Sequence, residues 1–459
     1  MHTPDTYKNE KPQTMTMSTA ALPRPTPLHR WLVLLFVSLA MFGNYYVYDS
    51  LGPVLDLLQT DLGFSNKQTG FLISVYNFGA IGALLIGGII IDRYGTKRAL
   101  LLFASICLLG AVVTALSPRY EVMASGRLLL GLGSEPLIVA ATTVLAKWFK
   151  GKELSFAFGI NLSLSRLGSA SADWSTGFAS PLYSNWQDPL WLATAFAGIS
   201  VAAAMLYWLQ EKRCEGRFNL GVTEQTDKLK FKELFLFGKR YWYIVALCVV
   251  FYSTIFPFRT FAIMYFQEAH GLAREAAGML NSMMMVSAII ATPLFGLLID
   301  KVGRRGLFMT LGCLMMLPLF LAVTYLPAGV PVMVFGSAIP LTLLLVMLLL
   351  GCVFSLVPAA MWPSVAYTVD QRRLGTAYAT MTLCQQIGWS IVPPVIGYLN
   401  DMNQASSENI AGYAPGMWFY TGLAVTGLIF ALLLWRHENK PMAQPGHPPE
   451  TASEHQHPG

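Results

Sequence analysis

Charge is what this sequence has least of. Only 12% of its 459 residues are charged, whereas 54% are hydrophobic, and a soluble domain usually has a charged share of about 25%. So few charges could not cover the surface of a water-soluble protein, which favours a membrane-embedded chain. Cysteine is also scarce, with six residues in no pairing or ligand spacing, so neither a disulfide framework nor a metal site is predicted.

Signals for processing and for enzymatic chemistry are missing as well. No short apolar core precedes the first long apolar segment, so no cleavable signal peptide is expected. The sequence Asn161-Leu-Ser163 falls inside an expected membrane span, where no glycan could be attached. Because no nucleophile with a base, phosphate loop or metal-ligand spacing is found, we expect neither an enzyme nor a cofactor. No basic patch with interleaved aromatics points to nucleic acid.

Twelve apolar segments are long enough to cross a bilayer, which takes about 20 residues. The expected spans are 31–52, 68–91, 99–117, 121–147, 153–180, 188–210, 241–267, 273–299, 307–327, 332–369, 374–400 and 412–435. The tenth is too long for one helix without a loop. A polar head (1–30), a charged linker (211–240) and a polar tail (436–459) flank two groups of six spans, 31–210 and 241–435. The expected fold class is an all-α membrane protein of two pseudo-symmetric six-helix bundles.

Basic residues predict the orientation of the chain. Of its 31 lysines and arginines, 25 fall on the side shared by both termini. The loops on the other side hold only Lys67, Arg119 and Arg274, and three arginines fall inside spans. By the positive-inside rule, the head, the linker and the tail are expected in the cytosol.

One motif occurs twice, as Gly88-Ile-Ile-Ile-Asp92-Arg93-Tyr-Gly95-Thr-Lys97-Arg98 and, 208 positions later without a gap, as Gly296-Leu-Leu-Ile-Asp300-Lys301-Val-Gly303-Arg304-Arg305. The duplication indicates two similar membrane units in parallel arrangement. The glycine permits a tight turn, and the acid at a helix end can pair with bases across the bundle interface when that side is closed. Alternatively, the bases only hold the turn in the cytosol. The expected gating residues of these turns are Asp92, Arg93, Gly95, Arg98, Asp300, Lys301, Gly303 and Arg304.

Two ionisable residues are predicted deep in the membrane. Glu135 and Arg166 are equally distant from the turn near Lys150 and Gly151, so on antiparallel helices they reach the same depth, near the midplane. Glu135 could receive a substrate ammonium and Arg166 a carboxylate, which its fork binds through two hydrogen bonds. Such a pair matches a zwitterion such as a peptide. The alternative is a structural Glu–Arg salt bridge without a ligand.

Further polar and aromatic residues are expected around this pair. Asp49 and Arg259 lie equally deep on helices that both rise from the cytosol, and they could form an outer latch or snorkel independently to the outer surface. Arg127, in Gly126-Arg127-Leu-Leu-Leu-Gly131-Leu-Gly133, is either a structural anchor, which could snorkel outward, or a coupling element. The remaining candidate substrate contacts are Tyr45, Tyr48, Arg259, Trp362, Gln385 and Gln386.

Several segments together carry a resemblance. They are Tyr45-Tyr-Val-Tyr48-Asp49, Gly133-Ser-Glu135, Trp148-Phe-Lys-Gly-Lys-Glu-Leu154, Ser165-Arg166-Leu-Gly-Ser169, Phe256-Pro-Phe258, Trp362-Pro-Ser-Val-Ala366 and Leu374-Gly-Thr-Ala-Tyr378. With the repeated turn, they resemble the branch of the major facilitator superfamily typified by the lysosomal dipeptide uniporter of animals. In that family a glutamate and an arginine of the fourth and fifth helices hold the two peptide termini, and Glu135 and Arg166 stand at those motif positions.

The chain also departs from that family. Arg259 stands where an apolar residue is expected, the head has no acidic dileucine sorting signal, and the outer loops have no glycosylation sequence. We therefore expect a microbial relative, multi-pass in a bacterial inner membrane, for which dependence on the family's accessory subunit is doubtful. The function expected is transport of a small zwitterion, foremost a dipeptide, by alternating access, with proton coupling left open. The rivals are a carrier of organic anions and a nutrient-sensing membrane protein that binds without net transport.

Overall fold

The computed structural model describes residues 23, 25–149, 153–218, 236–370 and 373–438. In this part of the chain, twelve helices have 21 residues or more. The first six are α1 (Pro27–Asp49), α3 (Asn66–Tyr94), α4 (Thr96–Leu116), α5 (Tyr120–Phe149), α6 (Leu154–Phe178) and α7 (Gln187–Cys214). The second six are α8 (Lys239–His270), α9 (Arg274–Val302), α10 (Arg305–Tyr325), α11 (Leu341–Ala366), α12 (Leu374–Met402) and α13 (Ala414–Glu438).

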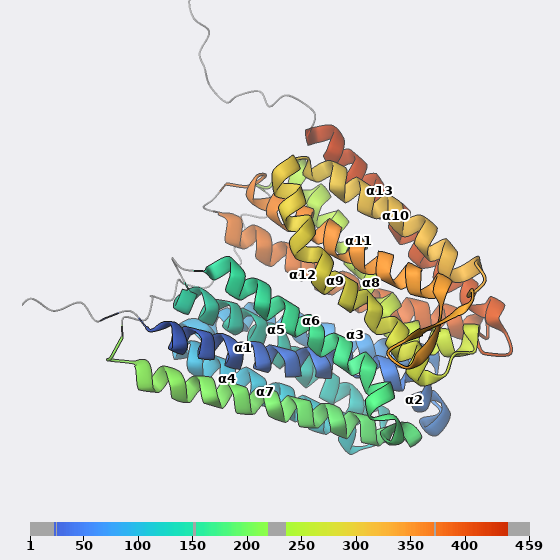
Figure 1. Cartoon of the computed structure of the whole chain (residues 1–459), viewed down its shortest axis with the longest axis horizontal. Helices are drawn as coiled ribbons and strands as arrows, with labels where there is room; N and C mark the ends of the chain where they lie inside the picture. The colour runs from blue at the N-terminus through green and yellow to red at the C-terminus, as the bar shows by residue number, and fades with distance from the viewer. Residues whose placement is uncertain (1–22, 24, 150–152, 219–235, 371–372, 439–459) are drawn as a thin grey trace, which may run out of the picture.

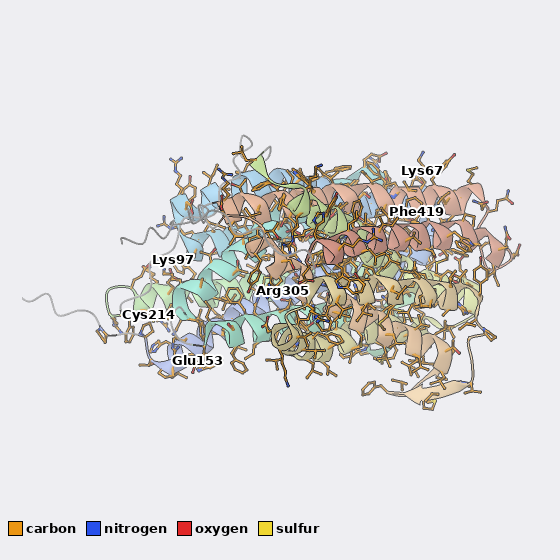
Figure 2. The ribbon with its side chains drawn as sticks, turned by 90° about the horizontal axis from the view of Figure 1, so that it is seen from above. Lys67, Lys97, Glu153, Cys214, Arg305 and Phe419 are labelled. Carbon is orange, nitrogen blue, oxygen red and sulfur yellow. The ribbon has the colours of Figure 1, made fainter. Side chains whose placement is uncertain are left out.

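These helices form two bundles that lie side by side, the first drawn from blue to green and the second from yellow to red (Figure 1). We call the end at which α1 begins and α13 ends the inner end, and the opposite end the outer end. Figure 2 shows Lys97 and Glu153 toward the inner end and Lys67 toward the outer end. The bundles meet chiefly where α3 packs against α12 and α6 against α9.

The repeat predicted from sequence is visible in the helix bounds. α3 and α9 both have 29 residues, and each bound of one is shifted by 208 from the other. Each is followed by a glycine with a left-handed backbone, Gly95 with φ 78° and Gly303 with φ 73°, a conformation in which other residues are strained. The motif glycines therefore make the two tight turns that connect α3 to α4 and α9 to α10.

Apolar character is unevenly distributed among the helices. Over the described residues, nine segments are long and apolar enough to cross a membrane, and α3, bent by 51° between Leu84 and Ile86, is a tenth. α6 and α12 do not meet this test because they carry many polar residues, among them Arg166 and Asp173 on α6 and Gln385 and Gln386 on α12. Both of these helices lie at the interface between the bundles, where polar side chains need not face lipid.

The structure departs from the predicted spans at the outer end. After α1 the chain does not go directly to α3 but forms η1 (Gly52–Val54) and α2 (Leu55–Leu62). The overlong span 332–369 begins with a hairpin of two antiparallel strands, β1 (Pro331–Val334) and β2 (Ser337–Pro340), and only then becomes α11. Short 3-10 helices, η2 (Ser180–Ser184) and η5 (Ile410–Tyr413), precede α7 and α13.

Parts of the sequence interpretation lie outside the described residues. These parts are most of the head, the turn 150–152, residues 219–235 of the linker and the tail after 438.

Candidate functional site

Glu135 and Arg166 lie at the midpoints of their helices. Glu135 is near the middle of α5 (Tyr120–Phe149), and Arg166 is the central residue of α6 (Leu154–Phe178). Pro136 follows Glu135 inside α5, and a proline there removes a main-chain hydrogen bond of the helix. The equal depth expected from sequence is thus matched by the helix geometry.

The Glu135 carboxylate is half-buried and is contacted from two other helices. The Tyr76 hydroxyl of α3 donates a hydrogen bond to Glu135 Oε1 at 3.3 Å. The Gln386 side chain of α12 also lies next to the Glu135 carboxylate, and Gln386 Oε1 is buried without a partner. Since α12 belongs to the second bundle, Glu135 links the two bundles.

The Arg166 guanidinium is bound by uncharged groups of the second bundle. Its Nη1 donates to the Ala288 carbonyl at 2.8 Å and to the Thr292 hydroxyl, both on α9. The guanidinium also stands 5.3 Å from the ring centre of Phe354 on α11, an arrangement that favours a cation. Neutral groups and an aromatic ring of the second bundle therefore hold Arg166 in a largely buried position.

Tyr45 of α1 lies close enough to both Glu135 and Arg166 to interact electrostatically with each. No ion pair within 4.0 Å joins Glu135 and Arg166 in the described chain. The alternative of a direct structural salt bridge is thus wrong for this conformation. The two opposite charges instead have separate partners, and both lie within electrostatic range of Tyr45.

Aromatic side chains of the second bundle stand next to Arg166. Tyr252 of α8 lies within electrostatic range of Arg166 and Tyr45, and its hydroxyl accepts a hydrogen bond from Trp362 Nε1 at 2.9 Å. Trp389 of α12 donates to the Tyr252 carbonyl at 2.8 Å. Gln385, another predicted contact, accepts from the Cys248 thiol at 3.4 Å. Trp362 and Gln385 therefore reach the site through Tyr252 and α8 rather than through Glu135 or Arg166.

Arg127 does not snorkel to the surface, which corrects one expectation. Its side chain is buried, and Nη1 and Nη2 donate to the Tyr48 carbonyl at 3.4 Å. The guanidinium also lies 5.9 Å from the ring centre of Tyr48 and 5.7 Å from that of Tyr76. Arg127 therefore binds the main chain of α1 at Tyr48, and its guanidinium lies between aromatic rings of α1 and α3.

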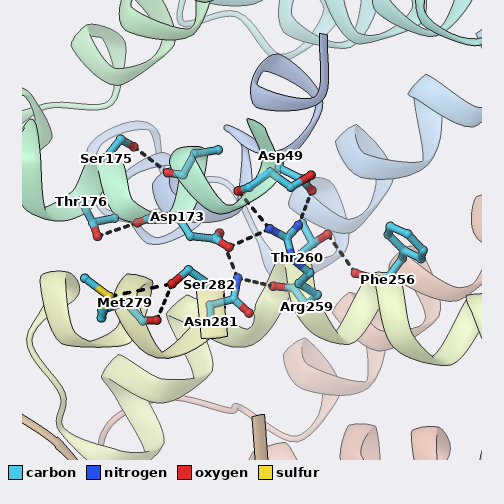
Figure 3. A network of polar contacts seen from close by, with 12 residues as sticks. Asp49, Asp173, Ser175, Thr176, Phe256, Arg259, Thr260, Met279, Asn281 and Ser282 are labelled. Carbon is cyan, nitrogen blue, oxygen red and sulfur yellow. Dashed lines mark hydrogen bonds and ion pairs between the residues drawn. The ribbon is translucent and has the colours of Figure 1, made fainter. Parts of the chain in front are cut away.

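Asp49 and Arg259 meet near the outer end in a buried cluster (Figure 3). Arg259 Nη1 is 2.5 Å from Asp49 Oδ1, and Nη2 is 2.6 Å from Asp173 Oδ2. Asn281 Nδ2 donates to Asp173 Oδ1 at 3.0 Å and to the Arg259 carbonyl at 3.2 Å. We call Asp49, Asp173, Arg259 and Asn281 the outer cluster. Independent snorkelling of Asp49 and Arg259 is wrong, because both are buried in this cluster.

Further contacts join the bundles near the outer end. Arg274, at the start of α9, donates to both carboxylate oxygens of Asp56 on α2, at 2.7 and 2.5 Å. Asp401, at the end of α12, accepts from the main-chain N–H of Asn66 at 2.9 Å and of Lys67 at 2.8 Å. The structure is therefore closed at its outer end. Figure 1 shows α6 and α9 diverging toward the inner end.

The predicted gating residues lie at the inner end, in the turns that follow α3 and α9 and in the adjoining helix ends. All eight are exposed there, namely Asp92, Arg93, Gly95, Arg98, Asp300, Lys301, Gly303 and Arg304. Asp300 is 3.5 Å from Arg305 within its own turn. Their placement fits an inner gate, and the gating role itself stays a prediction.

Several polar residues of these sites were not predicted from sequence, among them Tyr76, Asp173 and Asn281. Asp173 had a usable signal: it follows Arg166 by seven residues, which puts both on one face of a helix, and it is an acid inside an expected span. Arg259 had been expected to touch substrate, but in this conformation its side chain is bound by Asp49 and Asp173. For Tyr76 and Asn281 the sequence offers no comparable signal.

Comparison with known proteins agrees with this architecture. Residues 37–393 and 256–456 match the Major Facilitator Superfamily. The chain is similar to the lysosomal dipeptide transporter MFSD1 of Danio rerio, with 29% identity over 89% of this chain and 87% of that one. It is also 24% identical to the hexuronate transporter of Bacillus subtilis, over 86% and 93% of the two chains.

Solved structures resemble the fold at low sequence identity. The nucleoside transporter NupG superposes with a TM-score of 0.70 at 16% identity, over 88% of this chain and 99% of that one. A bacterial homologue of the human lysosomal transporter Spinster, in an inward-facing and occupied conformation, gives 0.69 at 15% identity, over 90% and 98%. With the repeated turn, two six-helix bundles and this match along most of its length, the chain belongs to the major facilitator superfamily and is a multi-pass integral membrane protein.

Proposed function

We propose that this protein carries small zwitterionic solutes, foremost dipeptides, across a membrane by alternating access. The observation that carries the proposal is the pair of opposite charges at mid-helix, Glu135 and Arg166, which both lie within electrostatic range of Tyr45 without pairing with each other. A dipeptide presents an ammonium and a carboxylate at separate ends. Each protein charge then has a substrate charge to bind, which compensates for desolvation of both.

A substrate could replace the groups that now bind Glu135 and Arg166. Arg166 donates to a main-chain carbonyl and a threonine hydroxyl, which are neutral acceptors. A substrate carboxylate would form stronger hydrogen bonds with Arg166, because it is charged. Glu135 is contacted by a tyrosine hydroxyl and a glutamine side chain, so an ammonium would find a carboxylate with no competing cation. Because Gln386 and Thr292 belong to the second bundle, substrate binding would act on both bundles at once.

Alternating access requires gates on both sides of this site. The outer cluster closes the outer end, and the exposed acids Asp92 and Asp300 stand in the inner turns where the bundles would close in the opposite state. A ligand redistributes these states only through its differential affinity for them. We infer from the basic residues that the inner end faces the cytosol, and we propose a bacterial inner membrane as the location. Uptake with and without a pH gradient distinguishes uniport from proton symport.

An organic-anion carrier is the second candidate. The similarity to the hexuronate transporter of Bacillus subtilis and to a probable sulfoacetate transporter of Cupriavidus necator favours it, and Arg166 alone would bind a carboxylate. Arg259, however, is already bound by two aspartates, and Glu135 would repel an anion. A ligand without an amine that binds as tightly as a dipeptide would favour this candidate over the zwitterion carrier.

The decisive test uses Glu135→Gln and Arg166→Ala. Each change removes one charge that would bind substrate, so dipeptide affinity should fall by about 2–5 kcal/mol, well over tenfold. Binding is measured by thermal shift of the purified protein, since a ligand of the native state raises its apparent stability. Transport is measured as dipeptide uptake into liposomes, which also separates a carrier from a sensor that only binds.

Matched controls are available at the outer end. Glu121→Gln and Arg119→Ala remove the same charges from exposed positions near the start of α5, and they should leave affinity unchanged. If the Glu135 and Arg166 variants fold and bind dipeptides as tightly as the unmodified protein, the substrate site lies elsewhere.

A further inference from the structure

The longest uncharged stretch of the chain includes a segment outside the membrane-spanning helices. From Gly306 to Val369 there is no aspartate, glutamate, lysine, arginine or histidine. This stretch contains α10, α11 and, between them at the outer end, the hairpin of β1 and β2. A connection that faces water usually carries polar or charged residues, so the lack of charge in this hairpin needs another explanation.

Both faces of the hairpin are apolar. Val332 pairs with Ile339 in the strand register; Ile339 is completely buried and Val332 is 36% exposed, so the β2 side of this face lies against the protein. The opposite face bears Pro331, Met333 and Ala338, all exposed, with Met333 at 68%. A two-stranded sheet with one face in water normally alternates apolar and polar residues. This hairpin does not alternate, which indicates an apolar medium on its outward face.

The turn of the hairpin holds an exposed phenylalanine in an unfavourable backbone conformation. Phe335 has φ 48° and Gly336 has φ 87°, and together they form the two-residue loop between Val334 and Ser337. Loops of this kind, with two positive φ angles, favour Asn-Gly or Asp-Gly, because a bulky residue is strained there. The Phe335 side chain is 81% exposed, so no contact within the protein explains why an aromatic residue stands at this turn.

The outward face of the hairpin is continuous with helix surfaces that face lipid. On α11, Leu341, Leu345 and Leu349 are exposed at intervals of four residues, which forms a stripe along one side of the helix. On α10, Leu311, Leu314 and Tyr325 are likewise exposed. Figure 2 shows the strands at the edge of the molecule, projecting sideways from the outer end. The same apolar surface therefore runs from the two helices onto the hairpin.

We propose that the hairpin lies in the outer interfacial layer of the bilayer, with Met333 and Phe335 inserted among the lipid chains. Apolar and aromatic side chains are favoured at this depth, where their burial stabilises membrane contact. The hairpin binds the lipid surface and thereby anchors the outer end of the second bundle to the membrane. Its base is fixed to the helices, since the Leu341 N–H donates to the Val330 carbonyl at 2.9 Å.

The test is spin-label accessibility in liposomes. A label is placed at Met333→Cys, which leaves Phe335 in place, and the accessibilities to oxygen and to a water-soluble nickel complex are measured. Leu345→Cys on α11 is the lipid-facing control, and Ser407→Cys, exposed in the outer loop before η5, is the water-facing control. The unmodified protein gives the background, because its six cysteines are buried or half-buried.

Insertion predicts that the label at 333 resembles the one at 345, with high oxygen and severalfold lower nickel accessibility than at 407. High nickel accessibility would place the hairpin in water and overturn the proposal. Low accessibility to both reagents would mean that a protein surface covers it, either a second copy or another protein, and would overturn it equally.

Discussion

The two main contacts between the bundles, α3–α12 and α6–α9, share close packing at a glycine but differ in their polar groups. Where α3 meets α12, Gly70 lies against the Pro393 carbonyl and Gly397 against the Asn66 carbonyl, so a Cβ at either glycine would collide with main chain. Where α6 meets α9, Gly278 lies against the Asp173 carbonyl and Thr176. Gly70 and Gly278 are 208 positions apart and hold the same place in the repeat. Both contacts thus share a close-packed glycine at the same repeat position, which lets helices approach.

The polar groups added to each contact differ. At α3–α12, Asp401 binds two main-chain N–H groups at the start of α3, donors that a helix leaves unsatisfied. At α6–α9, the outer cluster joins four helices, because two carboxylates bind the Arg259 guanidinium and Asn281 donates to one of them. Since a glycine packs against main chain at both contacts, the added polar groups distinguish them: Asp401 is bonded to main-chain donors, whereas an ion pair between side chains can be replaced by water. We infer that α3–α12 is the fixed contact and α6–α9 the one that opens.

The largest effect should come from Arg259→Gln. This change leaves Asp49 and Asp173 buried without their cation, which costs about 3–5 kcal/mol in the closed state. The outer end should therefore open, and a cysteine at Ser169, whose carbonyl accepts from Arg259 at 3.2 Å, should react faster with a membrane-impermeant maleimide.

The control for this variant is Arg274→Gln. The ion pair of Arg274 with Asp56 also joins the bundles but is partly exposed, with side chains 17% and 18% accessible, so its loss should matter much less. Equal labelling rates in the two variants would contradict a special role for the outer cluster.

The second prediction separates a simple Asp49–Arg259 pair from the outer cluster. For a simple pair, the exchange Asp49→Arg with Arg259→Asp should restore closure. In the observed cluster, an aspartate at position 259 would face Asp173 instead, so the exchange should fail. Adding Asp173→Asn removes that repulsion, and the triple variant should close better than the double one. Labelling at position 169 measures closure, and rescue by the double variant alone would exclude Asp173 from the latch.

The third prediction compares the inner ends of the two contacts. Asp92→Asn changes α3 and Asp300→Asn changes the same repeat position of α9, and both residues are far from Glu135. Each should slow uptake more than it weakens dipeptide binding, because it alters the balance of states rather than the site. If α9 is the helix that moves, Asp300→Asn should shift cysteine accessibility at position 169 more than Asp92→Asn does. A parallel loss of binding and uptake would assign these acids to the substrate site.

The smallest effect is expected at the fixed contact. Asp401→Ala removes the acceptor for two N–H groups of α3, comparable to loss of a helix cap, which costs about 1 kcal/mol. The melting temperature should fall by a few degrees, while the ratio of uptake to binding stays the same. Asp401→Asn keeps one acceptor oxygen and should lose less. A change in outer labelling on Asp401→Ala would show that α3–α12 also takes part in gating.

The helices and the repeat could be predicted from the sequence, because apolar segments indicate the helices and the duplicated motif indicates the repeat. The motif at Asp92 and Asp300 fixed the internal shift, and α3 and α9 follow it at both ends. Counting residues along two helices that both start at the inner end was enough to bring Asp49 and Arg259 to one level. The same counting could not predict that Asn281 belongs to the outer cluster, because this requires knowing which helices are neighbours and how each is rotated about its axis.

The hairpin could not be predicted from hydropathy, for a different reason. Residues 331–340 are as uncharged as the helix that follows them, so the composition of the segment does not change at Leu341. Only the turn at Phe335 and Gly336 interrupts the strands, and phenylalanine is not a residue that marks a turn. A glycine in a long apolar segment is equally compatible with a membrane helix.

The outer cluster also bears on how such a chain could arise. Asp49 and Arg259 are 210 positions apart, close to the 208 of the repeat, and they touch where α1 approaches α8. In a dimer of identical six-helix subunits, a contact of this kind would occur twice, once on each side of the twofold axis. Here the positions related to Asp49 and Arg259 by the repeat of 208 are Pro257 and Leu51, which cannot form the second copy of the ion pair. The pair is therefore made once, by two halves that have come to differ, so this gate belongs to the joined chain.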